Sequence, residues 1–359
     1  DLLCSGQNLG ASSVLDVSQL RAVVPGLNCS HATGAVRYYD GLTNDARLVV
    51  DTLRSAARFG LVLSNYIKLE EAVPNNGGWR CTLHDTLVDR THVVKARCVV
   101  NATGPWAGQF ERSQVRIRGT KGIHLVLDCK RLPIDHAVMM TDDQRVVYAI
   151  PWGDRVYLGT TDTDYTDRLE DVCSHAEDVD YLLTILNRYY PDATIGQDDV
   201  LRTWAGVRPL IANARGSPSD VSRGHEIHVA TDGWIDVAGG KLTTYRLMAQ
   251  QTLDHIVSWK GWQVSPCRTA HEPLLAESET RDVSGITPPP ICERVVKHAC
   301  DCEWAIHLDD LMIRRTRWHY YHRNVHKLAR RIAGWMATCL GWSNEERDKE
   351  IQRYYIVRD

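Results

Sequence analysis

The stretch 236–251, DVAGGKLTTYRLMAQQ, has the features of a ligand site at the start of a helix. A β-type run ends in two glycines, the second of them Gly240, and Lys241, Leu242 and Thr243 then lead into a helical pattern. The first N–H groups of a helix lack partners within it, and the helix dipole favours negative charge near them. The pattern therefore predicts a site that holds a phosphate or a ring carbonyl oxygen.

Two arginines and one histidine are candidates for binding and activating a substrate. Arg208 lies among apolar neighbours in the β-type run TWAGVRPLI, and Arg223 begins the next such run. A guanidinium in such a place needs an anionic partner, which is either a phosphate or one of the 45 Asp and Glu residues. His124 lies near Lys121 and two glycines in RGTKGIHLVLD, and it is either a structural or a functional histidine.

The segment CVVNATGPWAGQF predicts a buried strand that ends in a turn at Gly104, Pro105 and Trp106. Ligands of doubly wound sheets bind at the carboxyl ends of the strands, and Gly104 would let a cofactor approach the backbone closely. An ordinary strand-to-helix turn explains the same residues equally well. We interpret Thr160 to Asp162, which follow another β-type run, as turn residues.

These candidates lie on elements that alternate between helical and β-type patterns, which indicates an α/β fold. Short β-type runs with Gly and Asp turns between residues 115 and 164 predict a largely antiparallel sheet. The composition shifts after Lys260, where a Pro-rich hinge precedes about three helical segments. We expect a domain boundary between Trp262 and Pro288. Helical patterns are found at residues 16–27, 44–60, 174–191 and 242–259.

The composition is that of an ordinary globular protein, with 359 residues, 43% of them hydrophobic, and a formal net charge of −3. This charge gives no whole-chain case for nucleic-acid binding. The eleven cysteines are scattered, which predicts reduced thiols in a cytoplasmic protein. The stretch HACDC lacks a second cysteine pair at zinc-site spacing, so we predict no metal site.

Two further features concern the ends of the chain. Residues 311–344 hold seven Lys or Arg and no acidic residue, with Trp318, Tyr320 and Tyr321 among them. Such a stretch is either a surface for anionic lipid or a solvated helix face. The chain opens with DLLCSGQNLG, which has neither Met nor a targeting pattern, and we expect it to be a fragment.

Taken together, the motifs resemble the FAD-dependent, aerobic glycerol-3-phosphate dehydrogenases. The resemblance covers nearly the whole chain, and GGKLTTYR with GVRPL is its most specific part. The other matching segments are YYDGLTNDARLVVDTLRSAARFG, NATGPWAG, KGIHLVL, YAIPWGDRVYLGTTDTDY, SRGHEI, CRTAHEPL, DLMIRRTR and GWSNEER.

This resemblance implies a Rossmann-type FAD-binding domain, a substrate domain with an antiparallel sheet, and a C-terminal α-helical domain. The family's G-x-G-x-x-G motif is absent from the sequence, so we expect an incomplete FAD-binding domain in an N-terminally truncated chain. The expected bounds are 1–112, which includes inserted segments, and 231–262 for the FAD-binding domain, 113–230 for the substrate domain, 263–287 for a linker and 288–359 for the helical domain.

The implied reaction is oxidation of sn-glycerol 3-phosphate to dihydroxyacetone phosphate, with a hydride passing from C2 to flavin N5. His124, whose imidazole we expect to titrate near neutral pH, would be the base. Arg208 would stabilise developing charge, Arg223 would bind the phosphate, and Lys241 would touch both phosphate and flavin. The flavin would contact the two predicted turns, at Gly104, Pro105, Trp106, Gly240, Lys241, Leu242 and Thr243.

The resemblance implies quinone as the electron acceptor and a cytoplasmic location, with peripheral attachment to the cytoplasmic face of the membrane, and it leaves a homodimer open. Three alternatives remain. The first is a glycerol-3-phosphate oxidase that uses O₂. The second is another FAD-dependent oxidoreductase, for an amine or a hydroxy acid. The third is a non-catalytic fragment, because the nucleotide motif is missing.

Overall fold

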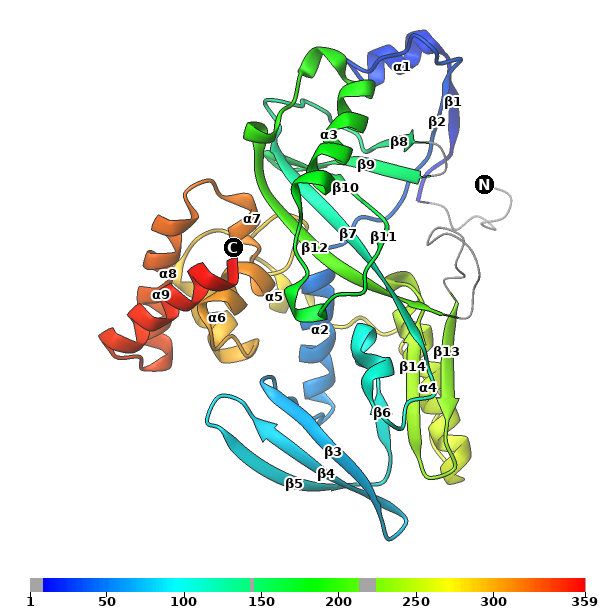
Figure 1. The fold of residues 1–359 in the computed structure, drawn as a ribbon, viewed down its shortest axis with the longest axis vertical. Helices are drawn as coiled ribbons and strands as arrows, with labels where there is room; N and C mark the ends of the chain where they lie inside the picture. The colour runs from blue at the N-terminus through cyan, green and yellow to red at the C-terminus, as the bar shows by residue number, and fades with distance from the viewer. Residues whose placement is uncertain (1–8, 143–144, 213–223, 359) are drawn as a thin grey trace.

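The computed structural model describes residues 9–142, 145–212 and 224–358 (Figure 1). A large antiparallel sheet lies above a smaller mixed sheet in the view of Figure 1, and a group of helices from the C-terminal part lies on the left, across the view from the smaller sheet. The described residues thus form the α/β, strand-rich and helical parts that the sequence predicts, and the predicted fold class is confirmed.

The large sheet is built around the long strand β7, Ile117–Asp128. Strands β10 and β11 pair with one edge of β7 and β12 pairs with the other, all antiparallel. One face is covered by the helix α3, Ala176–Tyr189, whose Leu182 and Leu186 are fully buried in the main core. The remaining strands of the sheet are β8 Val138–Asp142, β9 Arg145–Trp152, β10 Arg155–Gly159, β11 Thr163–Asp164 and β12 Val200–Ile211.

The N-terminal segment joins the core of the large sheet. Its two short strands, β1 Ser13–Leu15 and β2 Ala35–Arg37, pair with each other beside the helix α1, Val17–Val23. Asp16 caps α1 by accepting a hydrogen bond from the Gln19 N–H at 2.8 Å. This segment packs on the large sheet, and its assignment as an inserted segment of residues 1–112 stays a prediction.

The smaller sheet has the order β13-β14-β6, and only its β14–β6 pair is parallel. The helix α4, Tyr245–Lys260, follows β14 and packs against β13. Because β13 belongs to this sheet, the boundary expected at residue 230 falls within it. The domain division itself stays a prediction. The strands are β6 Val99–Asn101, β13 His225–Val229 and β14 Trp234–Gly239.

A third sheet and the helix α2, Asp45–Arg58, complete the lower half of the molecule (Figure 1). Asn44 caps α2 by accepting a hydrogen bond from the Arg47 N–H at 3.3 Å. The sheet is an antiparallel meander of β3 Ile67–Asn75, β4 Gly78–Asp85 and β5 Arg90–Ala96.

The C-terminal part is helical and has its own core, which includes the fully buried Trp318, Ile332 and Met336. Among the described residues, no helix is both long and apolar enough to cross a bilayer. The helices are α5 Glu277–Thr280, α6 Glu293–Cys302, the π-helix η8 Asp310–Arg315, α7 Trp318–Tyr321, α8 Val325–Leu340 and α9 Asn344–Arg358.

Candidate active site

One face of the large sheet has two paired glycines, Gly122 and Gly206, between polar side chains, and we call this part of the face the glycine floor. Alternate residues of a strand share a face, so the pairing of β7 with β12 sets three cross-strand pairs side by side. A Cβ on Gly206 would meet no described atom within 4 Å, so the middle of this face is open. The pairs are His124 with Trp204, Gly122 with Gly206, and Thr120 with Arg208.

Two buried polar atoms of this face have no hydrogen-bond partner among the described residues. They are Nδ1 of His124 and the hydroxyl oxygen of Thr120, which stand on either side of Gly122. Buried polar atoms are normally paired, and an exception needs an explanation. Pairing either atom requires a polar ligand group or an ordered water beside it.

The His124 ring is held between aromatic neighbours. It stacks on Trp204 with ring centroids 4.9 Å apart and an interplanar angle of 15°, and it meets Tyr157 edge-on at 6.1 Å. Burial, and then the charge of Arg208, lowers the pKa of the His124 imidazole to about 4. The expectation that it titrates near neutral pH is therefore wrong. The ring is neutral at neutral pH and free to accept a hydrogen bond or a proton.

Arg208 is held over the floor by the segment that follows β10. Its guanidinium donates to the Thr160 hydroxyl at 2.9 Å and to the Thr161 carbonyl and the Asp162 carboxylate, each at 3.2 Å. A Cβ on Gly122 would collide with this guanidinium. Arg208 thus has a carboxylate partner, and three residues that sequence reasoning treated as turn residues position it. The sequence signal that could have identified these three residues is a run of threonines and aspartates directly after a predicted strand.

Lys121, the other cation of the same motif, faces away from this floor. Its ammonium donates to the Asp178 carboxylate of α3 at 2.6 Å, and both side chains are buried. The strand alternation that points His124 to one face of the sheet points Lys121 to the other.

The second cluster lies where β6 and β14 end. Because these strands are parallel and adjacent, the turns that follow them lie at the same edge of the sheet. Gly240 and Gly104 have positive φ values of 81° and 60°, and a Cβ on Gly104 would meet nothing within 4 Å. Lys241 and Leu242 are exposed at the start of the short helix η7, Leu242–Thr244, which leads into α4.

A buried carboxylate holds the two turns together. Asp236, fully buried in β14, accepts hydrogen bonds from the Asn101 side chain at 2.7 Å and from the Gln114 N–H at 2.8 Å. The helix η2, Gly104–Gln109, contacts β14 as well as β7 and β12. The second cluster therefore adjoins the sheet that carries His124 and Arg208.

The C-terminal part supplies a wall of the site. Tyr320 of α7 packs on Trp204 with ring centroids 5.2 Å apart, so three rings run from His124 through Trp204 to the helical part. Nearby, Tyr321 meets Trp152 of β9 at 5.0 Å. Sequence reasoning assigned Tyr320 and Tyr321 to a surface, but both rings pack inward.

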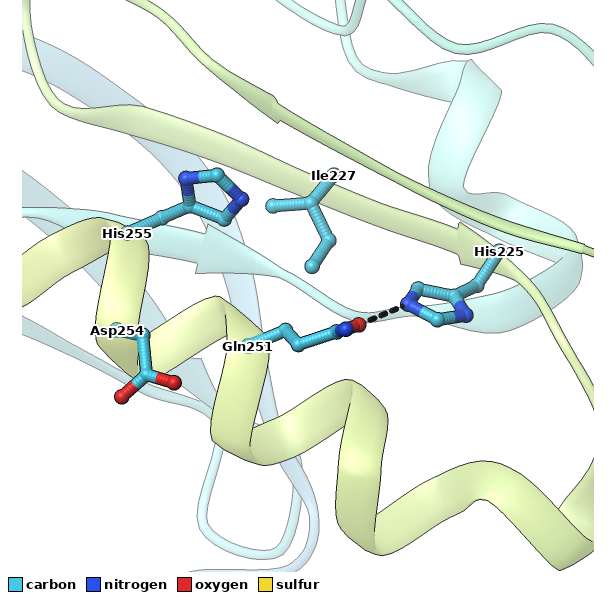
Figure 2. A pocket seen from close by; sticks show the side chains of 5 residues that line it. All are labelled: His225, Ile227, Gln251, Asp254 and His255. Carbon is cyan, nitrogen blue, oxygen red and sulfur yellow. Dashed lines mark hydrogen bonds between the residues drawn. The ribbon is translucent and has the colours of Figure 1, made fainter. Parts of the chain in front are cut away.

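A separate pocket of about 400 Å³ lies between β13 and α4 (Figure 2). His225 and Gln251 face each other across it, with 2.6 Å between Nε2 and Oε1, and Asp254 and His255 lie further along α4. The pocket contains none of the predicted site residues. No group of three potential ligand side chains among the described residues could hold a metal ion.

The structure thus brings the predicted residues together in two adjoining clusters. His124 and Arg208 share the sheet face, whereas Arg223 lies outside the described residues. The second cluster contains Gly104, Pro105, Trp106, Gly240, Lys241, Leu242 and Thr243.

The chain belongs to the FAD dependent oxidoreductase family, whose model matches residues 3–246. Residues 268–347 match a second model, the C-terminal domain of alpha-glycerophosphate oxidase. Membership confirms the class of protein and the cofactor, FAD, that the sequence predicts.

The resemblance to aerobic glycerol-3-phosphate dehydrogenases is also confirmed. The protein of that name from Bacillus subtilis (strain 168) is 34% identical over 285 residues, 76% of this chain and 51% of the relative. The one from Staphylococcus aureus (strain MRSA252) is 37% identical over 250 residues, 66% of this chain and 45% of the relative. The chain spans about half the length of these curated relatives.

Two solved structures share the fold. The glycerol-3-phosphate dehydrogenase from Bacillus halodurans, complexed with FAD, is 26% identical with a TM-score of 0.80, over 96% of this chain and 78% of that one. The L-alpha-glycerophosphate oxidase from Mycoplasma pneumoniae is 15% identical with a TM-score of 0.57, over 74% and 68% of the two chains. The second likeness concerns the fold alone.

The residues present fit the ring end of FAD. The open space above Gly104 lets a planar ring approach the backbone at the end of β6, whereas a Cβ on Gly240, which has a positive φ, would meet Met248. The first N–H groups of η7 have no partner within that helix and are donors for a ring carbonyl oxygen. The chemistry of this donor set therefore suits the flavin ring.

Proposed function

We propose that this chain carries the substrate site of an FAD-dependent glycerol-3-phosphate dehydrogenase, which oxidises the C2 hydroxyl of sn-glycerol 3-phosphate to give dihydroxyacetone phosphate. The names of the relatives supply the substrate. The observation that carries the proposal is the glycine floor, with unpartnered polar atoms of His124 and Thr120 on it and a guanidinium at its edge.

His124 would bind the C2 hydroxyl and accept its proton. An imidazole that is neutral at neutral pH has a lone pair for that purpose, and the depressed pKa means that the proton leaves again readily. Trp204 fixes the ring plane by stacking, so the imidazole meets the hydroxyl in one orientation.

Arg208 would stabilise negative charge that develops on the C2 oxygen, or bind the phosphate. Its ties to Thr160 and Asp162 keep the guanidinium in place before the substrate arrives. Lys241 would add a cation from the start of η7, and Arg223 would bind the phosphate. Both roles are proposals that rest on the family resemblance.

Gly104, Pro105 and Trp106 on one turn, and Gly240, Lys241, Leu242 and Thr243 on the other, would hold the flavin ring. When bound there, FAD supplies a two-electron acceptor next to the sheet face. The contribution of the chain itself is to orient the C2–H bond and to remove the hydroxyl proton.

We further propose quinone as the final electron acceptor and peripheral contact with a membrane from the cytoplasmic side. Lys327, Arg330 and Arg331 are exposed along α8 and support contact with anionic lipid. Other cations of the basic stretch are engaged within the fold. Arg314 pairs with Asp309 and Arg323 pairs with Asp128, so only part of the stretch is available for lipid.

Binding of sn-glycerol 3-phosphate and of glycerol, measured by calorimetry on the FAD-supplemented chain, tests the substrate. We expect the phosphate ester alone to bind measurably. Arg208→Gln should weaken its binding by about 10-fold to 100-fold, because a charge-assisted hydrogen bond is lost. Arg131→Gln is the matched control, since it breaks the exposed Arg131–Asp199 pair, which lies after the end of β7 and before the start of β12. Equal binding of glycerol and its phosphate ester would overturn the proposal.

A further inference from the structure

Arg317 stands at the junction between the C-terminal helices and the candidate site. It precedes α7 in the left-handed conformation, with φ of 58°, and its carbonyl accepts the Tyr320 N–H at 3.1 Å. Tyr320 packs on Trp204, and Trp204 packs on His124. Arg317 is therefore one turn of chain away from the stack of rings that borders the glycine floor.

The charges of Arg317 and Arg208 both act on His124, and that of Arg317 also acts on Tyr157. Arg317 lowers, and its partner Asp45 raises, the pKa of both His124 and Tyr157, although burial is the larger influence on each. The helix α7, which Arg317 precedes, contacts β12, so the Arg317–Asp45 pair lies where the helical part meets the large sheet.

The partner of Arg317 is unlike those of the other arginines that join the helical part to the rest. Arg47 pairs with Glu303, whose side chain is 2% exposed, and Arg323 pairs with Asp128, which is 10% exposed. Asp45 is 62% exposed, and it forms an ion pair with Arg317 across two domains. Water can solvate the Asp45 carboxylate once the ion pair breaks. Arg317 can therefore exchange Asp45 for another anionic partner at little cost in free energy.

We propose that Arg317 is a phosphate ligand, which exchanges the Asp45 carboxylate for the phosphate group of the substrate and so lets the helical part bind the substrate directly. This inference rests on the proposed function. A phosphate carries more charge than a carboxylate and accepts the forked hydrogen bonds of a guanidinium. Arg208 then faces the substrate from the sheet and Arg317 from α7.

Replacing Arg317 and replacing Asp45 should have opposite effects on the binding of sn-glycerol 3-phosphate. Calorimetry on the full chain supplemented with FAD measures this binding. Arg317→Gln should weaken binding by about tenfold or more, because a charge-assisted hydrogen bond is lost. Arg317→Lys should restore part of it. Asp45→Asn should tighten binding by about twofold to fivefold, because the competing carboxylate is gone.

Arg323→Gln is the matched control, because it removes an ion pair that joins the helical part to Asp128, the last residue of β7. Its affinity should equal that of the unchanged chain. If Arg317→Gln and Asp45→Asn both lower the thermal midpoint but leave affinity unchanged, the pair is structural and the inference is wrong. If the unchanged chain binds the ester and Arg208→Gln abolishes binding while Arg317→Gln does not weaken it, the inference alone fails. If the unchanged chain binds no ester, the proposed function fails together with it.

Discussion

His124 shows at the scale of one residue how burial changes the chemistry of a side chain. The imidazole lacks a hydrogen-bond partner at Nδ1 among the described residues and lies near a guanidinium, and its pKa is about 4. In the unfolded chain a histidine titrates near about 6.5. Its folded pKa is depressed, so the stability it contributes is present above about pH 6.5 and is lost as the pH falls through about 4.

Replacing His124 by Asn should remove this acid sensitivity. Between pH 7 and pH 4 the unchanged chain should lose up to about 3 kcal/mol more unfolding free energy than His124→Asn does. Urea unfolding at a series of pH values measures the difference. His136→Asn, at an exposed histidine in the bend before β8, should follow the unchanged chain. Parallel pH curves for the unchanged chain and His124→Asn would show that the imidazole is not buried neutral.

At the scale of elements, the site depends on how β7 and β12 pair. Their register places Gly206 opposite Gly122, and together they leave the floor between His124 and Arg208. Neither glycine has a left-handed φ, so the reason for glycine is space above the strand and not backbone freedom. The two differ in what a side chain would meet there, which makes them separable by mutation.

Gly206→Ala should fill the floor without disturbing the fold. Its Cβ points into open space, so we expect the unfolding free energy to change by less than about 1 kcal/mol. Affinity for sn-glycerol 3-phosphate should fall by about tenfold, because the methyl group takes up ligand space. Gly196→Ala, whose Cβ also meets nothing within 4 Å, is the control and should bind normally. Unchanged affinity in Gly206→Ala would place the substrate elsewhere.

Local signals in the sequence predicted the elements well. Asn44 caps α2 and Gly60 follows its end with φ of 85°, as the helix pattern between them predicts. The Gly-Gly-Lys turn before α4 was likewise readable from a strand, two glycines and a helical pattern. These features depend on residues within a few positions of each other, so no knowledge of packing was needed.

Contacts between distant segments could not be predicted in this way. Asp162 reaches Arg208 across 46 positions and Asp45 reaches Arg317 across 272. Nothing near Tyr320 in the sequence indicates that its ring packs on Trp204. Such contacts follow from how the sheets and the helical part dock, which local patterns do not encode. The sequence therefore predicted candidate residues but not the surroundings that decide their chemistry.

At the scale of the whole molecule, a buried charge cluster joins the helical part to α2. The Arg47 guanidinium donates to both Glu303 carboxylate oxygens, at 2.8 and 2.7 Å, and to Asp51 at 2.9 Å. Burial raises the pKa of Glu303, but hydrogen bonds from His298 and Arg47 lower it more, to about 2. Its stabilising contribution is therefore present above about pH 4.5 and is lost as the pH falls through about 2.

Replacing one charged member of this cluster should lower the unfolding free energy more than replacing both Arg47 and Glu303 together. Arg47→Met leaves Glu303 with only His298 and Arg54 nearby, and Glu303→Leu leaves Arg47 with only Asp51 as an ion-pair partner. Each should lower the unfolding free energy by about 1–3 kcal/mol, because buried charge-assisted hydrogen bonds are lost. The double variant should recover much of that loss, because neither charge remains. Urea unfolding of the four chains measures the coupling, with Arg58→Ala as control, since its pair with Glu279 is more exposed and should be worth less than about 1 kcal/mol. Additive losses would mean that the two charges do not depend on each other.

Because the helical part also carries Arg317 and Tyr320, either single variant should weaken phosphate-ester binding as well, whereas the double variant should restore it as the domains dock again.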